Sequence, residues 1–322
     1  MRKKILQISD EKTIATFIKQ LRKQATIDIL DELTDGQYSK NSLLAMVKDW
    51  NLFIEFCTQK HVSSLPASVT AVRLFIEHEA ARRKFATIRR YNVTIGLIHR
   101  ILSLKDPTAN PQVIHTMNFF KVEKKNDTKD TVPFEKQHLE KLSAKLMDST
   151  HPIERRNLAV YYIMFECALK RSELKSLTVN DIISDNGNKQ LAVYVGAQRY
   201  DLSEQAQRSL RQWLSLLPSI ENNLPLFSAI DRHGNINSVP LDDSSIYRIQ
   251  RYASDLLGLK VGFSGQSSRV GKVKDLAKQG MTLRDIQHYG RWLSPAMPNQ
   301  YLGNIGKAEL EKMVFKRFKP LG

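Results

Sequence analysis

Three residues in the last fifth of the chain have the types and spacing that chemistry on a phosphate ester needs. Arg269 closes the segment Ser264–Arg269 near the expected start of a helix, Trp292 follows it, and Tyr301 comes nine residues after the tryptophan. A guanidinium can hold two phosphate oxygens through parallel hydrogen bonds, and a phenol can act as a nucleophile. The spacing therefore predicts a site that brings a phosphodiester to a tyrosine hydroxyl.

The net charge of the chain points to a polyanion as its partner. Forty-nine lysines and arginines stand against 33 acidic residues, which gives a formal charge of +16. A surplus of this size attracts a polyanion over distances near the Debye length. Solubility alone needs far less net charge, so nucleic acid is the predicted partner.

Length and composition indicate a folded protein of two domains. The chain has 322 residues, of which 42% are hydrophobic and 25% charged. It shows no apolar run of about 18 residues and no signal peptide at its beginning, so we expect no membrane span and a cytoplasmic protein. Cys57 and Cys167 lie in apolar helical patterns and are expected to be buried thiols. No Cys/His cluster has metal-ligand spacing, so no metal is expected.

The first domain is expected to be a helical bundle over residues 11–122, after a tail over 1–10. Apolar residues at steps of three and four predict a helix along 43–57 with Ser42 or Asn41 as its cap. Further helices are expected over 68–83, capped by Ser68, over 87–104, and from Pro111. Four or five such helices make a compact bundle.

Basic residues gather around one helix start in this bundle. They are Arg82, Arg83, Lys84, Arg89 and Arg90. Backbone amides at a helix start and basic side chains can jointly hold phosphates, so these residues are predicted to bind DNA. The alternative interpretation is a solvated turn.

The second domain is expected over residues 134–322, after a polar linker over 123–133. Helices are predicted over 135–148 and 152–168 and from Arg171, and short β-rich runs over 178–183, 190–195 and 199–202 predict a small antiparallel sheet. The remaining helices are expected over 204–216, 243–256, 266–279, 282–289, 294–302 and 307–318. The fold class is therefore mainly α with a small antiparallel β-sheet, an α+β second domain.

Two blocks of sequence carry a resemblance to a known family. Residues 157–182 are similar to the segment in which a catalytic arginine follows a Gly-Leu or Leu-Leu pair and an acidic residue lies three positions on. Residues 264–301 are similar to the block with a His-x-x-Arg pair, a His-or-Trp position and a tyrosine nucleophile. The chain thus resembles the tyrosine recombinases of the phage integrase superfamily over nearly its whole length. The resemblance implies a core-binding domain followed by a catalytic domain.

The resemblance also implies a role for several residues. Tyr301 would be the nucleophile, Arg269 the second phosphate clamp, Trp292 a hydrogen-bonding and packing residue beside the phosphate, and Glu173 the residue that orients the first clamp. The reaction exchanges one phosphodiester for another, so it needs no cofactor and no metal. Each residue also has an ordinary interpretation: Tyr301 as a half-buried helix residue, Trp292 as core and Glu173 as a surface acid.

Three positions depart from the family pattern. Lys170 stands where the first arginine is expected, and Arg171 follows at about 100° around a helix; Lys170 is favoured as the clamp, with Arg171 as the alternative. Gln266 replaces the histidine and cannot titrate near neutrality. Arg199 is the nearest candidate for the catalytic lysine, with Lys189 further off, and arginine is a poor general acid.

The predicted function is a site-specific DNA recombinase that cleaves and rejoins duplex DNA through a 3′-phosphotyrosyl intermediate, with attenuated or partner-dependent activity. The resemblance implies a nucleoid-associated protein of a mobile element that acts in integration, excision or resolution, with an accessory protein as a further expected partner. It also implies a dimer on each DNA site and a tetramer in synapsis, linked by a terminal helix whose apolar stripe is Leu310, Met313 and Val314. That stripe could instead pack on its own domain.

Two other functions stay open on sequence alone. A degenerate recombinase could act as a non-cleaving, sequence-specific DNA-binding or architectural protein. An RNA-binding protein or an unrelated helical regulator is the third alternative.

Overall fold

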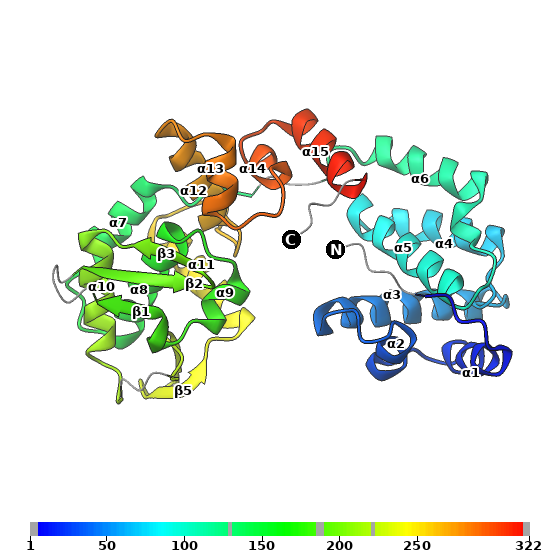
Figure 1. Ribbon diagram of the computed structural model, residues 1–322, viewed down its shortest axis with the longest axis horizontal. Helices are drawn as coiled ribbons and strands as arrows, with labels where there is room; N and C mark the ends of the chain where they lie inside the picture. The colour runs from blue at the N-terminus through cyan, green and yellow to red at the C-terminus, as the bar shows by residue number, and fades with distance from the viewer. Residues whose placement is uncertain (1–5, 128–130, 185–189, 220–222, 318–322) are drawn as a thin grey trace. The chain divides into compact units, whose positions relative to one another are not determined.

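The computed structural model describes residues 6–127, 131–184, 190–219 and 223–317. Parts of the predicted tail, linker and terminal helix, together with Lys189, lie outside these ranges. The chain divides into two compact units, residues 1–129 and 130–322. The described residues are mostly helical with two small antiparallel sheets, which confirms the predicted fold class (Figure 1).

Within residues 6–127 the first unit consists of six α-helices and one 3₁₀ turn at Pro107–Ala109. The α-helices are α1 Glu11–Leu21, α2 Ile27–Leu33, α3 Lys40–Gln59, α4 Val69–Ala80, α5 Phe85–Ile101 and α6 Pro111–Glu123. Ser68 caps α4 as predicted, accepting a hydrogen bond from the amide of Ala71 at 3.1 Å. The expected start of α3 was wrong, because Ser39 and not Asn41 or Ser42 precedes the helix. The helices α1 and α2 were not predicted individually.

The core of the first unit is aromatic and lies between α3, α4 and α5. Trp50 and Phe53 of α3 are fully buried, and the Trp50 ring nitrogen donates to the carbonyl of Leu21 at 2.9 Å. Asp49 is also buried, and Arg90 of α5 pairs with both of its carboxylate oxygens at 2.7 and 2.8 Å. A buried charge needs such a partner, so this pair joins α3 to α5.

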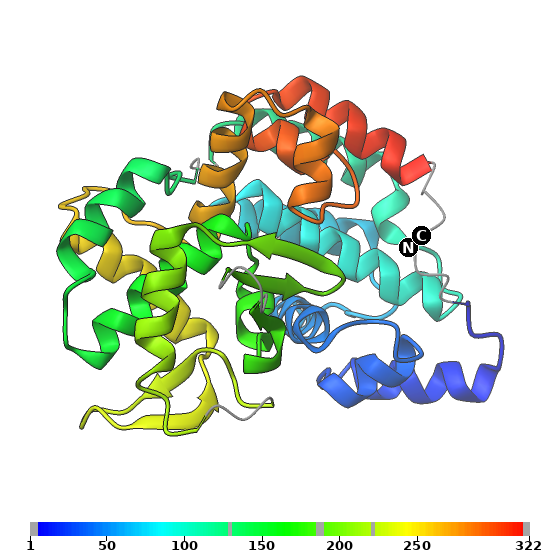
Figure 2. The same cartoon turned by 60° about the vertical axis from the view of Figure 1, so that its left-hand side comes forward.

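In the second unit α8 packs against α7, α10 and α12, and the unit also contains a three-stranded sheet. Its α-helices are α7 Lys136–Leu146, α8 Pro152–Glu166, α9 Arg171–Ser176, α10 Glu204–Leu214, α11 Asp243–Leu256, α12 Ser267–Lys278, α13 Leu283–Tyr289, α14 Ala296–Tyr301 and α15 Ile305–Arg317. The strands β1 Ile182–Ser184, β2 Leu191–Val195 and β3 Gln198–Asp201 pair antiparallel in chain order. The β2–β3 hairpin is seen in green in Figure 2.

The predicted strand over 178–183 is shorter than expected, because residues 179–181 form a 3₁₀ turn before β1. The second sheet, β4 Ser228–Ile230 with β5 Ile236–Pro240, was not predicted. Its two strands are mostly exposed or half-buried, so they lack the alternation that marks a strand in sequence.

Helix α8 forms the centre of the second core, as its almost continuous apolar sequence indicated. Tyr161 is fully buried and its hydroxyl donates to the carbonyl of Ile249 in α11 at 2.7 Å. Trp213 of α10 is buried in the same core. Cys57 and Cys167 are buried and free, as expected. Because α8 is packed on several sides in this core, the position of its carboxyl end is fixed.

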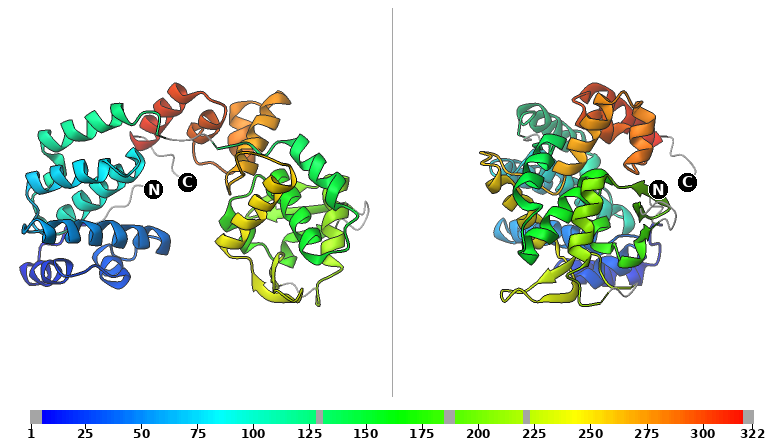
Figure 3. Two further views of the ribbon diagram at one scale, coloured as in Figure 1. Left: turned by 180° about the vertical axis from the view of Figure 1, so that it is seen from behind. Right: turned by 90° about the vertical axis from the view of Figure 1, so that its left-hand side faces the viewer.

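A smaller apolar cluster joins α12, α13 and α14, the orange segments of Figure 3. Val273 and Leu276 of α12 and Ile286 of α13 form its buried part, and Trp292 and Tyr301 pack against them. Helix α15 lies on α14 through buried Ala308. Among the described residues, none of the helices is both long and apolar enough to span a membrane.

Candidate active site

The candidate site is built where two helices, α8 and α13, end in the same way. Ala168 follows α8 with φ = 47°, and Arg291 follows α13 with φ = 57°, so both residues adopt the left-handed conformation that ends many helices. The next amide in each case turns back into the helix: Leu169 donates to Met164, and Trp292 donates to Gln287, each at 3.0 Å. The last carbonyls of both helices remain available, and they carry the negative end of the helix dipole.

Arg269 of α12 occupies the space between these two helix ends. Its guanidinium donates to the carbonyl of Ala168 at 2.6 Å and to that of Gly290 at 2.8 Å. The indole of Trp292 stacks on it with 4.2 Å between the guanidinium carbon and the ring centre. Arg269 is only 2% exposed, and burial lowers its pKa while Glu173 acts in the opposite direction. The predicted second clamp is therefore held rigidly by backbone carbonyls.

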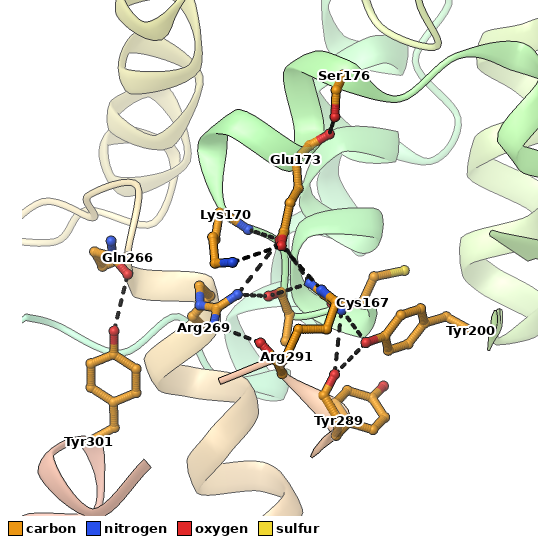
Figure 4. Close-up of polar contacts among 12 residues, drawn as sticks. Cys167, Lys170, Glu173, Ser176, Tyr200, Gln266, Arg269, Tyr289, Arg291 and Tyr301 are labelled. Atoms are coloured by element: carbon orange, nitrogen blue, oxygen red, sulfur yellow. Dashed lines mark hydrogen bonds and ion pairs between the residues drawn. The ribbon is translucent and has the colours of Figure 1, made fainter. Parts of the chain in front are cut away.

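The carboxylate of Glu173 lies among three cations (Figure 4). Arg291 contacts both of its oxygens, at 3.2 and 2.8 Å, the ammonium of Lys170 lies 3.1 Å away, and Arg269 lies 3.7 Å away. Burial raises the pKa of Glu173, but the hydrogen bonds from Arg291 and the Lys170 amide outweigh it and lower the pKa to about 2. Glu173 is thus ionised and is more than a surface acid.

Tyr301 lies on the other side of Arg269 from Glu173 in Figure 4. Its hydroxyl donates to the side-chain oxygen of Gln266 at 3.2 Å, and its ring meets that of Trp292 edge-on at 6.0 Å between ring centres. Burial raises the pKa of the Tyr301 phenol, and the charge of Arg269 partly opposes that rise. Gln266 can hold the hydroxyl but cannot take its proton.

The two candidates for the first clamp contact different parts of the site, Lys170 the carboxylate of Glu173 and Arg171 the backbone at Gly265. Lys170 is 47% exposed and pairs with Glu173. The side chain of Arg171 runs over Gly265, since a Cβ on that glycine would lie 2.4 Å from the Cδ of Arg171. Within the described residues the Arg171 guanidinium has no hydrogen bond or ion pair, so it adds a second exposed cation beside Gln266. The choice between Lys170 and Arg171 stays a prediction.

The contact that the structure shows for Arg199 lies outside the group around Glu173. Arg199 lies on β3 with its side chain paired to Asp201 at 2.9 Å. Because side chains alternate along a strand, its neighbour Tyr200 points the other way and contacts Arg291. Lys189, the other candidate, falls outside the described residues.

Sequence reasoning missed Arg291 and Tyr200 as parts of this site. Arg291 lies directly before Trp292, and its side chain donates to Glu173, to the carbonyls of Cys167 and Ala168, and to Tyr200. Tyr200 and Tyr289 donate in turn to the carbonyls of Tyr289 and Glu166. The available signal was a charged residue between Gly290 and Trp292, at a position that ends a helix.

The basic residues of the first unit surround the turn between α4 and α5. Lys84 and Arg89 have no ion pair among the described residues, and both are exposed. Arg82 and Arg83 lie near buried Glu79, at 3.8 and 3.3 Å. Arg90 is committed to Asp49, so its first role is structural. The first amide of α5, on Phe85, is also taken, because it donates to Asp127 at 2.6 Å. Fewer phosphate-binding groups are free here than the sequence suggested.

The comparisons with known proteins agree with this architecture. The Cre recombinase of Escherichia phage P1 is 21% identical over 312 residues, which cover 89% of this chain and 90% of Cre. An integrase/recombinase XerD homolog of Selenomonas ruminantium is 26% identical over 286 residues, 83% of each chain.

Solved structures show the same fold. A XerH site-specific recombinase bound to palindromic difH substrate, in a post-cleavage complex, has a TM-score of 0.62 at 14% identity and covers 94% of this chain and 87% of that one. The Tn1549 transposon integrase with transposon right end DNA has a TM-score of 0.59 at 12% identity and covers 94% of this chain and 99% of that one. The sequence also matches the Phage integrase family over residues 133–305, more than half of the chain. The chain therefore belongs to the phage integrase family and is a tyrosine recombinase by sequence and by fold.

Proposed function

We propose that this protein is a site-specific DNA recombinase that cleaves and rejoins duplex DNA through a 3′-phosphotyrosyl intermediate. The observation that carries the proposal is the convergence of Arg269 and Tyr301. The indole of Trp292 contacts both, with the Arg269 guanidinium 4.2 Å from one ring centre and the Tyr301 ring 6.0 Å from Trp292. A buried guanidinium and a tyrosine ring that both contact one indole suit a phosphodiester bound beside them.

In the proposed reaction the Tyr301 oxygen attacks the phosphorus, the bond from phosphorus to the 5′ oxygen breaks, and the phenol proton passes to water. The 5′ oxygen takes up a proton and departs as a hydroxyl, while the 3′ phosphate stays on Tyr301. One phosphodiester replaces another, so the reverse attack by a 5′ hydroxyl rejoins the strand. Arg269 and a second cation, Lys170 or Arg171, hold the non-bridging oxygens as negative charge builds up.

The site lacks effective groups for proton transfer, so we expect slow cleavage. The raised pKa of Tyr301 disfavours its phenolate, and Gln266 cannot act as a base. Arg199 faces Asp201 and cannot serve as an effective acid near neutral pH. Lys170 is the lysine that pairs with Glu173 in the described site, and we assign it as the candidate proton donor near the leaving oxygen.

Double-stranded DNA is the proposed substrate and partner. The formal charge of +16 supports it, and so do two structural relatives that are described as bound to difH substrate and to transposon right end DNA. Helix α15 supports a homo-oligomer, because Leu310, Met313 and Val314 are 55–64% exposed on it. We propose that this stripe contacts a neighbouring subunit, with two subunits on each DNA site and four in synapsis.

The test is a covalent trap. Duplexes from the DNA that flanks the gene are first selected for binding. A nick is then placed at successive positions along each strand. After cleavage next to a nick, the short fragment with the free 5′ hydroxyl diffuses away, so the strand cannot be rejoined. We expect a protein–DNA adduct that resists denaturation and that falls by more than about 10³-fold in Tyr301→Phe.

Binding that is equal in the unaltered protein and in Tyr301→Phe serves as the control for folding. Specific binding with no adduct at any nick position would overturn the cleavage function. That result would favour the second candidate function, a recombinase fold kept as a DNA-binding or architectural protein.

A further inference from the structure

The guanidinium of Arg291 is fully engaged by the protein. Its Nε and Nη2 atoms hold both oxygens of Glu173, and both Nη atoms donate to the carbonyl of Cys167 at 3.1 Å. Nη1 also contacts the hydroxyl of Tyr200, and Nη2 the carbonyl of Ala168. The side chain is 17% exposed. With these donors engaged, Arg291 is placed to act on its neighbours and not on DNA directly.

The backbone at Arg291 shows that this placement has an energetic cost. Its φ of 57° is the left-handed conformation, which glycine adopts freely and which is unfavourable for a residue with a Cβ. Such a conformation persists where surrounding contacts hold it. Here the contacts are those of its own side chain with Glu173 and with the end of α8.

Glu173 has more cationic partners than its single charge needs. Arg291 alone pairs with both carboxylate oxygens, and Lys170 makes one further contact at 3.1 Å. Lys170 is also the more exposed of the two, 47% against 17%. Lys170 can therefore leave the carboxylate while Glu173 keeps a forked partner, so its departure leaves no unpaired buried charge.

We propose that Arg291 is a positioning residue for DNA cleavage, which holds Glu173 and the carboxyl end of α8 so that Lys170 is released to the scissile phosphate. The inference rests on the proposed cleavage function. In this arrangement Arg291 pairs with the carboxylate and Lys170 binds the phosphate, two tasks that a single arginine could combine. A purely structural Arg291 would join α8 to α13 and would be indifferent to the residue at position 170.

The experiment is a double-mutant cycle between positions 291 and 170 in the full chain. Arg291→Gly removes the guanidinium and suits the left-handed backbone, so the loss of the side chain is separated from backbone strain. On the nicked duplex we expect Arg291→Gly to slow adduct formation by about 30-fold or more, with DNA affinity within about threefold. Arg284→Ala removes one exposed positive charge from α13 and is the matched control, with a rate within about twofold.

The decisive arm is Lys170→Arg. In the otherwise unaltered protein it should lower the rate, because Lys170 is the assigned proton donor and arginine is a poor acid near neutral pH. Measured against its own parent, the same substitution in the Arg291→Gly background should give a rate ratio at least about tenfold more favourable, because an arginine at 170 can there pair with Glu173 in place of Arg291. This dependence on position 170 is what a structural role lacks.

Each result decides the matter. An Arg291→Gly protein that is as active as the unaltered one overturns the inference, and so does a Lys170→Arg effect of equal size in both backgrounds. If Arg291→Gly does not fold by circular dichroism, Arg291→Lys replaces it in the cycle, with a smaller loss and the same dependence on position 170 expected. If the unaltered protein forms no adduct, the proposed function has failed, and that outcome is distinct from an adduct that Arg291 does not influence.

Discussion

At the scale of single residues, the site depends on how two helix ends satisfy their last carbonyls. Arg269 and Arg291 donate to the carbonyls of Cys167, Ala168 and Gly290, to which no backbone amide of the described residues donates. Two guanidinium groups lie close together here, and Glu173 compensates their repulsion with one negative charge. The carboxylate is therefore central to both the stability and the electrostatics of the site.

This role of Glu173 predicts a specific pH dependence. Its pKa is lowered from 4.5 to about 2 in the folded chain. Because the pKa is lower in the folded state, the ionised carboxylate stabilises the fold above pH 4.5, and this contribution is lost as the pH falls toward 2. Glu173→Gln should lower the melting temperature of the carboxy-terminal unit at pH 7 by about 2–8 °C, and the difference should shrink between pH 4.5 and 2.5.

Calorimetry of both proteins across this pH range is the measurement. Asp148→Asn is the control, because Asp148 is 90% exposed and its pair with Arg208 is solvated. That variant should move the melting temperature by less than about 1 °C at pH 7. A Glu173→Gln difference that stays constant down to pH 2.5 would show that Glu173 is not held ionised by its neighbours.

At the scale of elements, backbone contacts hold α12 against the segment around Phe134, which precedes α7. The amide of Phe134 donates to the carbonyl of Ser267 at 2.9 Å, in the first turn of α12. Gly271 lies one turn further along, where a Cβ would come within 1.7 Å of the Phe134 carbonyl oxygen. Because the obstacle is backbone, it cannot move aside as a side chain could. This contact sets the position from which Arg269 reaches the helix ends.

Gly271→Ala should therefore destabilise the second unit. We expect a loss of about 1–3 kcal/mol, the usual range for inserting a methyl group into a closely packed contact. Urea unfolding at constant pH measures it through the shift in midpoint. Gly306→Ala, in α15, is the matched control, because its new Cβ would meet no atom within 4 Å. That control should be neutral or stabilise by up to about 1 kcal/mol. Equal behaviour of the two variants would contradict the close approach of α12.

At the scale of the whole molecule, we expect the formal charge of +16 to contribute more to the free energy of DNA binding than any one residue does. Binding that neutralises phosphates releases counterions, so affinity falls as salt rises. The basic residues of the first unit do not contribute alike, because Lys84 and Arg89 are exposed and without ion pairs among the described residues, while Arg90 pairs with Asp49.

Fluorescence anisotropy on a selected duplex should show affinity falling by about 10³- to 10⁵-fold between 50 and 200 mM salt. Lys84→Ala and Arg89→Ala should each reduce the slope of log affinity against log salt by about one. Arg90→Ala should instead lower stability by about 2–4 kcal/mol, because it leaves Asp49 buried without a partner. An affinity that does not change with salt, or an Arg90→Ala protein that is as stable as the unaltered one, would refute this division.

The sequence by itself determined the fold class, the helices with strong apolar periodicity and the family. Helices such as α3, α8 and α11 were predictable because their patterns are local, and Arg269, Trp292 and Tyr301 were recognisable because their order along the chain is characteristic. The weak strands β4 and β5 and the helices α1 and α2 carried too little pattern to be placed.

Only the tertiary structure decided how the substituted positions are arranged. It brought Arg291 to Glu173 across 118 residues of chain, turned Arg199 toward Asp201, and committed Arg90 to a buried carboxylate. The reason is physical: a guanidinium binds whichever carboxylate or helix end the packing brings near it. Which partner a guanidinium binds depends on where α8, α12 and α13 meet. Residue type and spacing along the chain do not reveal that meeting point.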